Sequence, residues 1–273
     1  MARRPTAHRN RPTPRDRVAL VTGAASGLGA ALTRQLLAEG ARVLALDLSL
    51  AALDAQHGAH ANLRKRAHDV RDRADAALAV AELVDTWGQL DLAIHNAGVV
   101  GGGPLQQFDP ATSDRILDVN LRGVLHGTEA AYAQMCRQGT GQIVNVASMA
   151  GLHAVPYSAV YAASKHGVVG LTLSLREEAR PKGVRVSVAC PGLIATAIFS
   201  SATDAGGYQY AQQVARVPGG AQTPEEATRA LLDGAARDEA VITFPRSSRA
   251  LALATRLAPG LLRRAIGLTM SPR

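Results

Sequence analysis

The segment VALVTGAASGLG, residues 18–29, decides the fold of this chain. Val18–Val21 is an apolar run that predicts a buried strand, and Leu28–Glu39 has helical spacing and stops at Gly40. The turn between them is rich in glycine, which permits a tight turn and lets a pyrophosphate approach backbone N–H groups at a helix N-terminus. The segment therefore predicts a dinucleotide-binding turn, with an ordinary glycine-rich turn as the alternative.

The alternation of short apolar runs with helical stretches continues along the chain. Apolar runs that predict strands lie at Arg42–Leu46, Leu90–His95, Ile143–Ala147 and Val184–Ala189. Helical stretches lie between them, including Ala74–Trp87 and Ala159–Arg180. Because strands that alternate with helices form βαβ units, the sequence predicts an α/β fold of Rossmann type. In such a doubly wound parallel sheet, with helices on both faces, ligands bind at the carboxyl ends of the strands.

The second predicted strand ends at Asp47, where a carboxylate can accept hydrogen bonds from both hydroxyls of an adenosine ribose. The same charge would repel a 2′-phosphate. No arginine or lysine stands at Leu48, at Ser49 or within the glycine-rich turn, so NAD is favoured over NADP. The alternative is a surface aspartate that caps the next helix, although Ser49 could fill that role instead.

Two further segments are placed to reach the cofactor. Asp69 and Val70 follow what we interpret as a third apolar stretch and could contact the adenine, although Asp69 could equally cap the helical stretch after Arg71. The fourth strand is followed by small or polar residues that let the backbone approach a cofactor: Asn96, Ala97 and Gly98.

A tyrosine and a lysine stand four residues apart in the helical stretch Ala159–Arg180. Residues i and i+4 share a helix face, so Tyr161 and Lys165 should point together into the cleft. A free phenol has a pKa of about 10, and a nearby ammonium should lower it toward the range useful to an acid or base. Lys165 can also bind a nicotinamide ribose. The alternative is an exposed pair on an amphipathic helix.

Ser148 and Asn120 are candidates for supporting roles. Ser148 lies just past the strand Ile143–Ala147, and its hydroxyl could bind a substrate oxygen as charge develops there, or could simply occupy a turn. Asn120 falls inside a helical stretch although asparagine is a poor helix former. This suggests a hydrogen-bonding task, such as holding a water behind Lys165, with a solvated helix face as the alternative.

The composition fits one globular catalytic domain, expected at 17–243, with a substrate-covering segment at about 193–222. Hydrophobic residues make up 47% of the 273 residues. Because two cysteines form no disulfide framework, a cytoplasmic location is expected.

The positive charge is concentrated in a basic arm at 1–16, expected to be disordered, and a basic amphipathic extension at 244–273. Because the body between them is mildly acidic, we expect no nucleic-acid partner. The extension could contact a membrane surface, but we favour short helices that pack over the substrate segment or a neighbouring subunit.

These residues together resemble a short-chain dehydrogenase/reductase. The resemblance runs from about Arg17 to Thr243 and rests on Thr-Gly-x-x-x-Gly-x-Gly at 22–29, Asn-Ala-Gly at 96–98 and Tyr-x-x-x-Lys at 161–165. Cys190–Thr196 also resembles the family segment that touches the nicotinamide carboxamide. The resemblance implies a seven-stranded sheet, homodimers or homotetramers formed through the helices of Asn120 and Tyr161, and a catalytic tetrad of Asn120, Ser148, Tyr161 and Lys165. It further implies a cofactor site that includes Gly23, Ser26, Gly27, Leu28, Gly29, Pro191, Gly192, Ile194 and Thr196.

The sequence therefore predicts an NAD(P)-dependent oxidoreductase that moves a hydride between the nicotinamide and a secondary alcohol or ketone carbon, without a metal ion. The residues expected to line the substrate pocket are His153, Tyr157, Phe199 and Tyr208. They are apolar or amphipathic, and Arg216 is the one cation of the substrate segment, which favours a hydrophobic substrate. The alternative is a non-catalytic dinucleotide-binding sensor or scaffold. A sugar-nucleotide epimerase or dehydratase would need a longer chain after Thr196.

Overall fold

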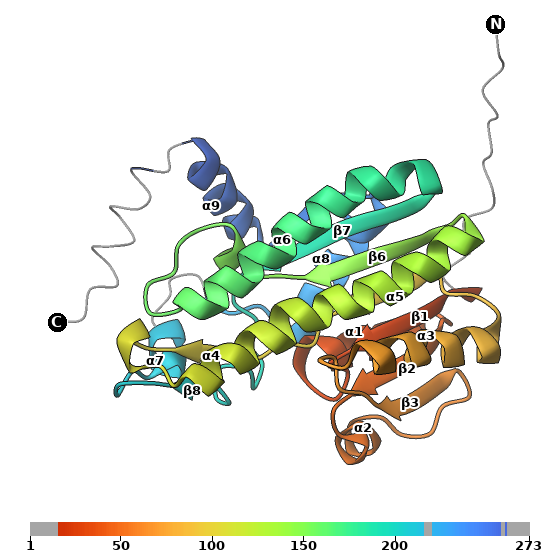
Figure 1. Cartoon of the computed structure of the whole chain (residues 1–273), viewed down its shortest axis with the longest axis horizontal. Coiled ribbons are helices and arrows are strands. Elements are labelled where there is room, and N and C mark those ends of the chain that lie inside the picture. Colours follow the sequence, from red (N-terminus) through yellow and green to blue (C-terminus); the bar gives the residue numbers. More distant parts are fainter. Residues whose placement is uncertain (1–15, 216–219, 258–259, 261–273) are drawn as a thin grey trace, which may run out of the picture.

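The computed structural model describes residues 16–215, 220–257 and 260 (Figure 1). Seven strands form one parallel sheet in the order β3-β2-β1-β4-β6-β7-β9. The strands are β1 (Val18–Thr22), β2 (Arg42–Asp47), β3 (Leu63–Ala67), β4 (Leu92–His95), β6 (Gly141–Val146), β7 (Val184–Pro191) and β9 (Val241–Phe244). The predicted doubly wound parallel sheet is thereby confirmed.

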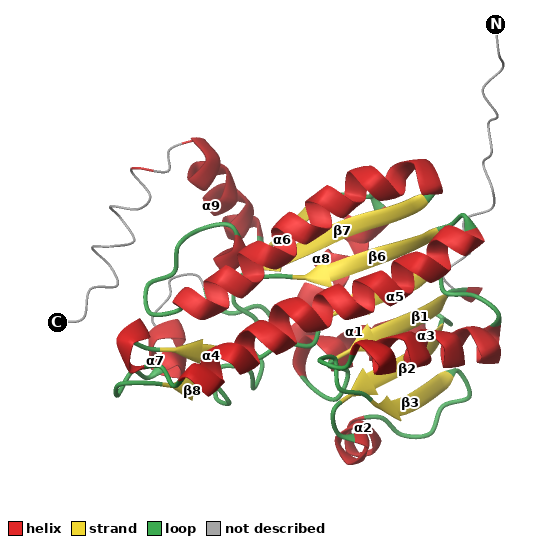
Figure 2. Ribbon diagram, in the orientation of Figure 1, coloured by secondary structure: helices red, strands yellow, loops and turns green. Residues whose placement is uncertain are grey.

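Helices cover both faces of this sheet (Figure 2). One face carries α1 (Gly27–Ala38) and α8 (Pro224–Ala236), and the other carries α3 (Arg73–Trp87), α5 (Gly123–Gln138) and α6 (Ala159–Ala179). The remaining helices are α2 (Leu50–Gln56), α4 (Pro110–Leu117), α7 (Tyr210–Ala215) and α9 (Arg246–Leu257). None of the helices in the described ranges is long and apolar enough to span a membrane.

Strand β1 shows why the sheet needs cover on both sides. Ala19 and Val21 pack into the core under α1 and α8, whereas Val18 and Leu20 pack into the core under α3 and α5. Successive side chains of a strand point to opposite faces, so a continuous apolar run marks a strand that is buried on both. This is the physical basis of the strand prediction from Val18–Val21.

Two local features differ from the sequence expectations. The third strand, β3, has the sequence LRKRA and lies at the sheet edge, so the interpretation of an apolar stretch before Asp69 was wrong. An edge strand exposes one side to solvent and tolerates such charges. Strand β9 continues to Phe244, one residue past the expected end of the catalytic domain.

Asn120 lies in a π-helical turn, Asp118–Arg122, between α4 and α5. Such turns interrupt the regular helix and are frequent at functional sites. The poor helix propensity of asparagine had pointed to an unusual position here. Residues 1–15 of the predicted basic arm and Arg216 lie outside the described residues, as does most of the chain after Leu257.

Candidate active site

A cavity of about 740 Å³ lies at the carboxyl ends of the sheet strands. The predicted cofactor residues that line it are Gly23, Ser26, Gly27, Leu28, Asp47, Asp69, Val70, Asn96, Ala97, Gly98, Tyr161, Lys165, Pro191, Gly192, Ile194 and Thr196. Ser148 and three predicted substrate residues, His153, Phe199 and Tyr208, line it as well. One continuous cavity therefore connects the glycine-rich turn with the tyrosine–lysine pair.

The glycine-rich turn is built by close backbone packing. Gly29 lies behind the cavity wall, where an added Cβ would come within 2.1 Å of the Gly23 carbonyl oxygen. Gly23 and Gly27 adopt positive φ values of 67° and 51°, which side chains disfavour. Ser26 begins α1 with an extended backbone, and its side chain makes no capping hydrogen bond. The first N–H groups of α1 are consequently available to an anion.

Asp47 is held beside this turn. Its Oδ2 accepts a hydrogen bond from the Ala25 N–H at 3.0 Å. Ser49, rather than Asp47, caps α2, because its hydroxyl accepts a hydrogen bond from the Ala52 N–H at 3.2 Å. The capping alternative for Asp47 was therefore wrong, and its carboxylate borders the cavity.

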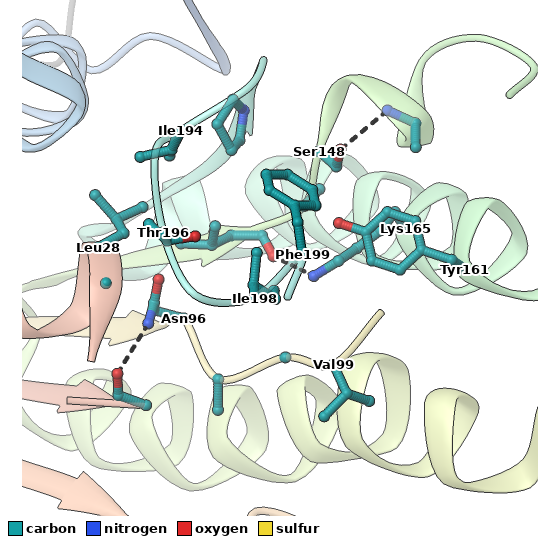
Figure 3. A pocket seen from close by; sticks show the side chains of 18 of the residues that line it. Leu28, Asn96, Val99, Ser148, Tyr161, Lys165, Ile194, Thr196, Ile198 and Phe199 are labelled. Atoms are coloured by element: carbon teal, nitrogen blue, oxygen red, sulfur yellow. Dashed lines mark hydrogen bonds between the residues drawn. The ribbon is translucent and has the colours of Figure 1, made fainter. Parts of the chain in front are cut away.

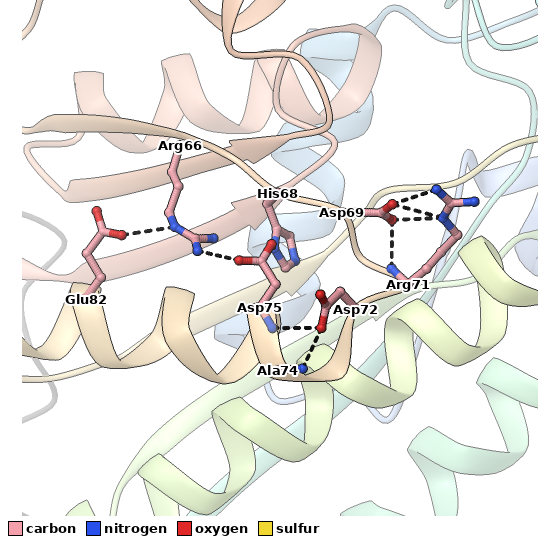
Figure 4. A network of polar contacts seen from close by, with 8 residues as sticks. All are labelled: Arg66, His68, Asp69, Arg71, Asp72, Ala74, Asp75 and Glu82. Atoms are coloured by element: carbon pink, nitrogen blue, oxygen red, sulfur yellow. Dashed lines mark hydrogen bonds and ion pairs between the residues drawn. The ribbon is translucent and has the colours of Figure 1, made fainter.

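The sequence analysis missed two arginines in the cavity wall, Arg71 and Arg115. Arg71 donates hydrogen bonds to both oxygens of Asp69, and the Arg71 guanidinium lowers the pKa of that carboxyl (Figure 4). Asp72, and not Asp69, caps α3 by accepting hydrogen bonds from two backbone N–H groups. Asp69 thus keeps Arg71 paired at the cavity edge. No local pattern distinguished these arginines from surface residues.

Asn96 joins the ends of two central strands. Its side-chain amide donates to the Thr22 carbonyl at 3.0 Å, and its backbone N–H donates to the Thr22 hydroxyl at 2.9 Å. The Ala97 N–H donates to the same hydroxyl at 3.1 Å. These bonds fix the floor of the cavity between β1 and β4.

Tyr161 and Lys165 project from α6 toward the cavity, with Ser148 near the phenol (Figure 3). The Lys165 ammonium donates to the Val146 carbonyl at 3.0 Å and lies 5.8 Å from the centre of the Tyr161 ring. Lys165 is only 3% exposed, and burial lowers its pKa to about 8. The predicted shared face is therefore present in the structure.

The expected effect of Lys165 on the tyrosine is not found in this geometry. Burial raises the pKa of Tyr161 above its usual range, and the nearby Tyr210 adds to the rise, whereas the Ser148 hydroxyl opposes it. Lys165 directs its ammonium to Val146 instead. Lys165 makes no contribution to the pKa of Tyr161 in this geometry, and the lowering of that pKa by Lys165 stays a prediction.

Asn120 is fully buried and lies behind the cavity wall. Its amide holds Val99, accepting from the Val99 N–H and donating to the Val99 carbonyl, both at 2.8 Å. An added Cβ on Gly98 would lie 3.2 Å from the Asn120 amide oxygen and 3.5 Å from the Lys165 ammonium. Asn120 thus positions the loop that follows β4 against Lys165. A water held behind Lys165 stays a prediction.

The substrate end of the cavity is aromatic. Tyr157, predicted to line it, is not part of the wall but stacks on Tyr208 with ring centres 5.1 Å apart. Tyr210 and Ser158 do line the cavity. The sequence analysis placed Tyr210 within the substrate-covering segment but named neither residue as part of the site. The concentration of tyrosines in the substrate segment was a signal that could have identified Tyr210.

Helix α9 forms another part of the wall through Ser247, Ser248 and Leu251. Ser248 is buried, and an added Cβ on Gly192 would come within 2.5 Å of its hydroxyl oxygen. The extension therefore packs against the start of the substrate segment, as the favoured alternative predicts for its first helix. The second predicted helix falls outside the described residues.

Leu251→Ala is expected to raise the KM for the substrate severalfold, because Leu251 supplies apolar surface to the cavity and its loss corresponds to about 1 kcal/mol or more. Leu253→Ala is the matched control on the same helix, since Leu253 is 58% exposed and is not part of the wall. Steady-state kinetics of both variants provide the measurement. Equal KM values in the two variants would show that α9 does not contribute to substrate binding.

The comparisons with known proteins agree with this site. A family model described as short chain dehydrogenase matches residues 17–206. The 2-(R)-hydroxypropyl-CoM dehydrogenase of Xanthobacter autotrophicus is 39% identical over 195 residues, which cover 66% of this chain and 76% of that protein.

Two solved structures extend the likeness to the whole fold. A short-chain dehydrogenase/reductase from Burkholderia phymatum in complex with NAD has a TM-score of 0.82 at 26% identity, covering 92% of this chain and 96% of that one. A short-chain dehydrogenase from Burkholderia cenocepacia in complex with NADP has a TM-score of 0.80 at 26% identity, covering 96% of this chain and 100% of that one. This chain belongs to the short-chain dehydrogenase family. It is an NAD(P)-dependent oxidoreductase that acts on secondary alcohols or ketones.

Proposed function

We propose that this chain is an NAD-preferring dehydrogenase or ketoreductase of apolar secondary alcohols and ketones, with Tyr161 as the proton donor and acceptor. The observation that supports it best is the continuous cavity that joins the glycine-rich turn to Ser148, Tyr161 and Lys165. A non-catalytic sensor has no need for a phenol and an ammonium side by side at the end of a cofactor cavity. The sensor alternative is therefore not favoured.

The residues present fit a dinucleotide. Gly23 and Gly27 line the cavity with bare backbone, which a pyrophosphate can approach closely. The Ser26 side chain makes no hydrogen bond to the N-terminal N–H groups of α1, so these groups can bind an anion. Asp47 stands where a ribose is expected, at the end of β2. When bound, the nicotinamide supplies or accepts the hydride.

The catalytic roles follow from the positions of the side chains. The Ser148 hydroxyl holds the substrate oxygen, and Tyr161 donates its proton to that oxygen as a ketone is reduced. A phenol is protonated at neutral pH even at its ordinary pKa of about 10, so Tyr161 can start the reduction as the proton donor. The Lys165 ammonium uses one of its three donors on Val146, which leaves donors for the nicotinamide ribose. Asn120 positions the loop at Val99 and is assigned the water relay.

A panel of secondary alcohols and ketones with NAD and NADP in parallel, followed by the absorbance of the reduced cofactor, tests this function. Turnover of apolar members is expected. An absence of turnover across the panel, together with intact NADH binding, would contradict it.

We also propose a homodimer or homotetramer formed through α5 and α6, which light scattering would show as a multiple of the 28.4 kDa chain mass.

Asp47→Ser is expected to narrow the preference for NAD over NADP by about tenfold, because it removes one negative charge from the site of a 2′-phosphate. The measurement is kcat/KM for each cofactor with one substrate. Asp54→Ser is the control, since Asp54 pairs with Lys65 on neighbouring elements and is not part of the cavity wall. If the unmodified protein prefers NADP, the charge argument fails and Arg71 or Arg115 becomes the candidate phosphate ligand.

A further inference from the structure

The few aromatic residues of this chain are concentrated at the substrate end of the cavity. The sequence has one tryptophan, five tyrosines and three phenylalanines. Three aromatic contacts link a cluster there, whose members are Tyr157, Phe199, Tyr208 and Tyr210. Tyr161 lines the same cavity as three of them. Large flat side chains in a chain otherwise built from small aliphatic residues make a surface suited to an apolar ring.

Tyr210 is the most firmly held member of this cluster. Its side chain is stacked on Phe199, with ring centres 6.0 Å apart, and meets the edge of Tyr208 at 6.2 Å. Its backbone N–H donates to Asp204 Oδ2 at 2.9 Å. An added Cβ on Gly102 would come within 2.3 Å of the ring, so the phenol has no space to swing in that direction. Tyr210 therefore presents its hydroxyl from a fixed position.

The surroundings of that hydroxyl are polar but incompletely satisfied. The hydroxyl oxygen of Ser158 is buried and has no hydrogen-bond partner in the described structure. Ser158 lies close enough to Tyr210 to oppose the rise in its pKa that burial causes, although the geometry falls short of a hydrogen bond. Ser158 directly precedes α6, three residues before Tyr161, so both face the cavity from the same side of that helix.

Tyr210 and Tyr161 line the same cavity. A charge on Tyr210 would oppose ionisation of Tyr161, and no hydrogen bond joins the two phenols in the part of the chain that the structure describes. The two phenols thus line one cavity without a direct hydrogen bond between them. A small polar group that enters between them would gain hydrogen bonds that the protein alone leaves unmade.

The charge of this region limits the chemistry of such a group. Asp204 contributes to raising the pKa of both Tyr208 and Tyr210. A negative group in this environment would be repelled, whereas a neutral hydroxyl or carbonyl would not. The subsite therefore suits a neutral oxygen.

We propose that Tyr210, supported by Ser158, binds a second neutral oxygen of the substrate, a hydroxyl or carbonyl adjacent to the reacting carbon of an apolar ring. The reacting oxygen itself is held by Ser148 and Tyr161. This inference rests on the proposed function and assigns Tyr210 as a residue that determines specificity. The preferred substrates are thus cyclic hydroxyketones or diketones rather than simple cyclic ketones.

The test compares cyclohexanone with its α-hydroxy and α-keto derivatives in NADH-dependent reduction, and reports the ratio of their kcat/KM values. The unmodified protein is expected to favour the derivatives by about tenfold, the worth of one to two buried hydrogen bonds. Tyr210→Phe should abolish the preference for the derivatives, and Ser158→Ala should reduce that preference. Tyr132→Phe, a tyrosine on α5 that is not part of the cavity wall, is the control that retains the ratio.

The outcomes separate this inference from the function on which it rests. Reduction of cyclohexanone without preference for the derivatives, or an unchanged ratio in Tyr210→Phe, overturns the assignment of Tyr210 alone. No reduction of any of the three compounds, with NADH binding intact by fluorescence titration, contradicts both the inference and the proposed substrate class.

Discussion

Tyr161→Phe is expected to lower turnover by about 10² or more, the scale of general acid–base catalysis, while NADH binding stays nearly unchanged. Phenylalanine keeps the ring that lines the cavity and removes only the hydroxyl that supplies the proton. We propose that the cofactor is held mainly by other groups that line the cavity, including the glycine-rich turn and Lys165. The measurement is kcat with the best substrate, together with a fluorescence titration of NADH.

Tyr132→Phe serves as the control for this variant, because it removes a phenolic hydroxyl that donates to the Glu178 carbonyl on the outside of α6. Turnover of Tyr161→Phe close to that of the unmodified protein would show that another group moves the proton. A parallel loss of NADH affinity would instead indicate that the substitution has disturbed the cofactor site.

Gly29→Ala is expected to weaken NADH binding by about tenfold to a hundredfold and to lower the melting temperature. The added Cβ would lie 2.1 Å from the Gly23 carbonyl oxygen and 2.6 Å from the Asn96 amide nitrogen, so the backbone of the turn must move. Overpacking of this kind costs typically about 1–3 kcal/mol, and the turn that moves is the one expected to hold the pyrophosphate.

Gly58→Ala is the matched control for Gly29→Ala, because an added Cβ at Gly58 meets nothing within 4 Å. Its NADH affinity and melting temperature should equal those of the unmodified protein. Tight NADH binding by Gly29→Ala would mean that the turn can relax and that close packing of α1 against it is not required.

The local chemistry of the chain determined the fold and the main site. The apolar run Val18–Val21 favours a strand buried on both faces, and the glycines after it permit a tight turn into a helix. Tyr161 and Lys165 face the same cavity because their spacing matches the pitch of the helix. These features depend on neighbours within a few residues, so the sequence carries them directly.

Only the tertiary structure decided how these groups affect one another. The partner of Lys165 is the Val146 carbonyl on a different element, and burial by distant segments sets the pKa of Tyr161. The pairing of Arg71 with Asp69 at the cavity edge likewise had no local signal of its own. Desolvation, and contacts between residues far apart in the chain, depend on how the whole chain packs. The periodicity of a helix or a strand reflects only neighbouring residues, so it does not predict them.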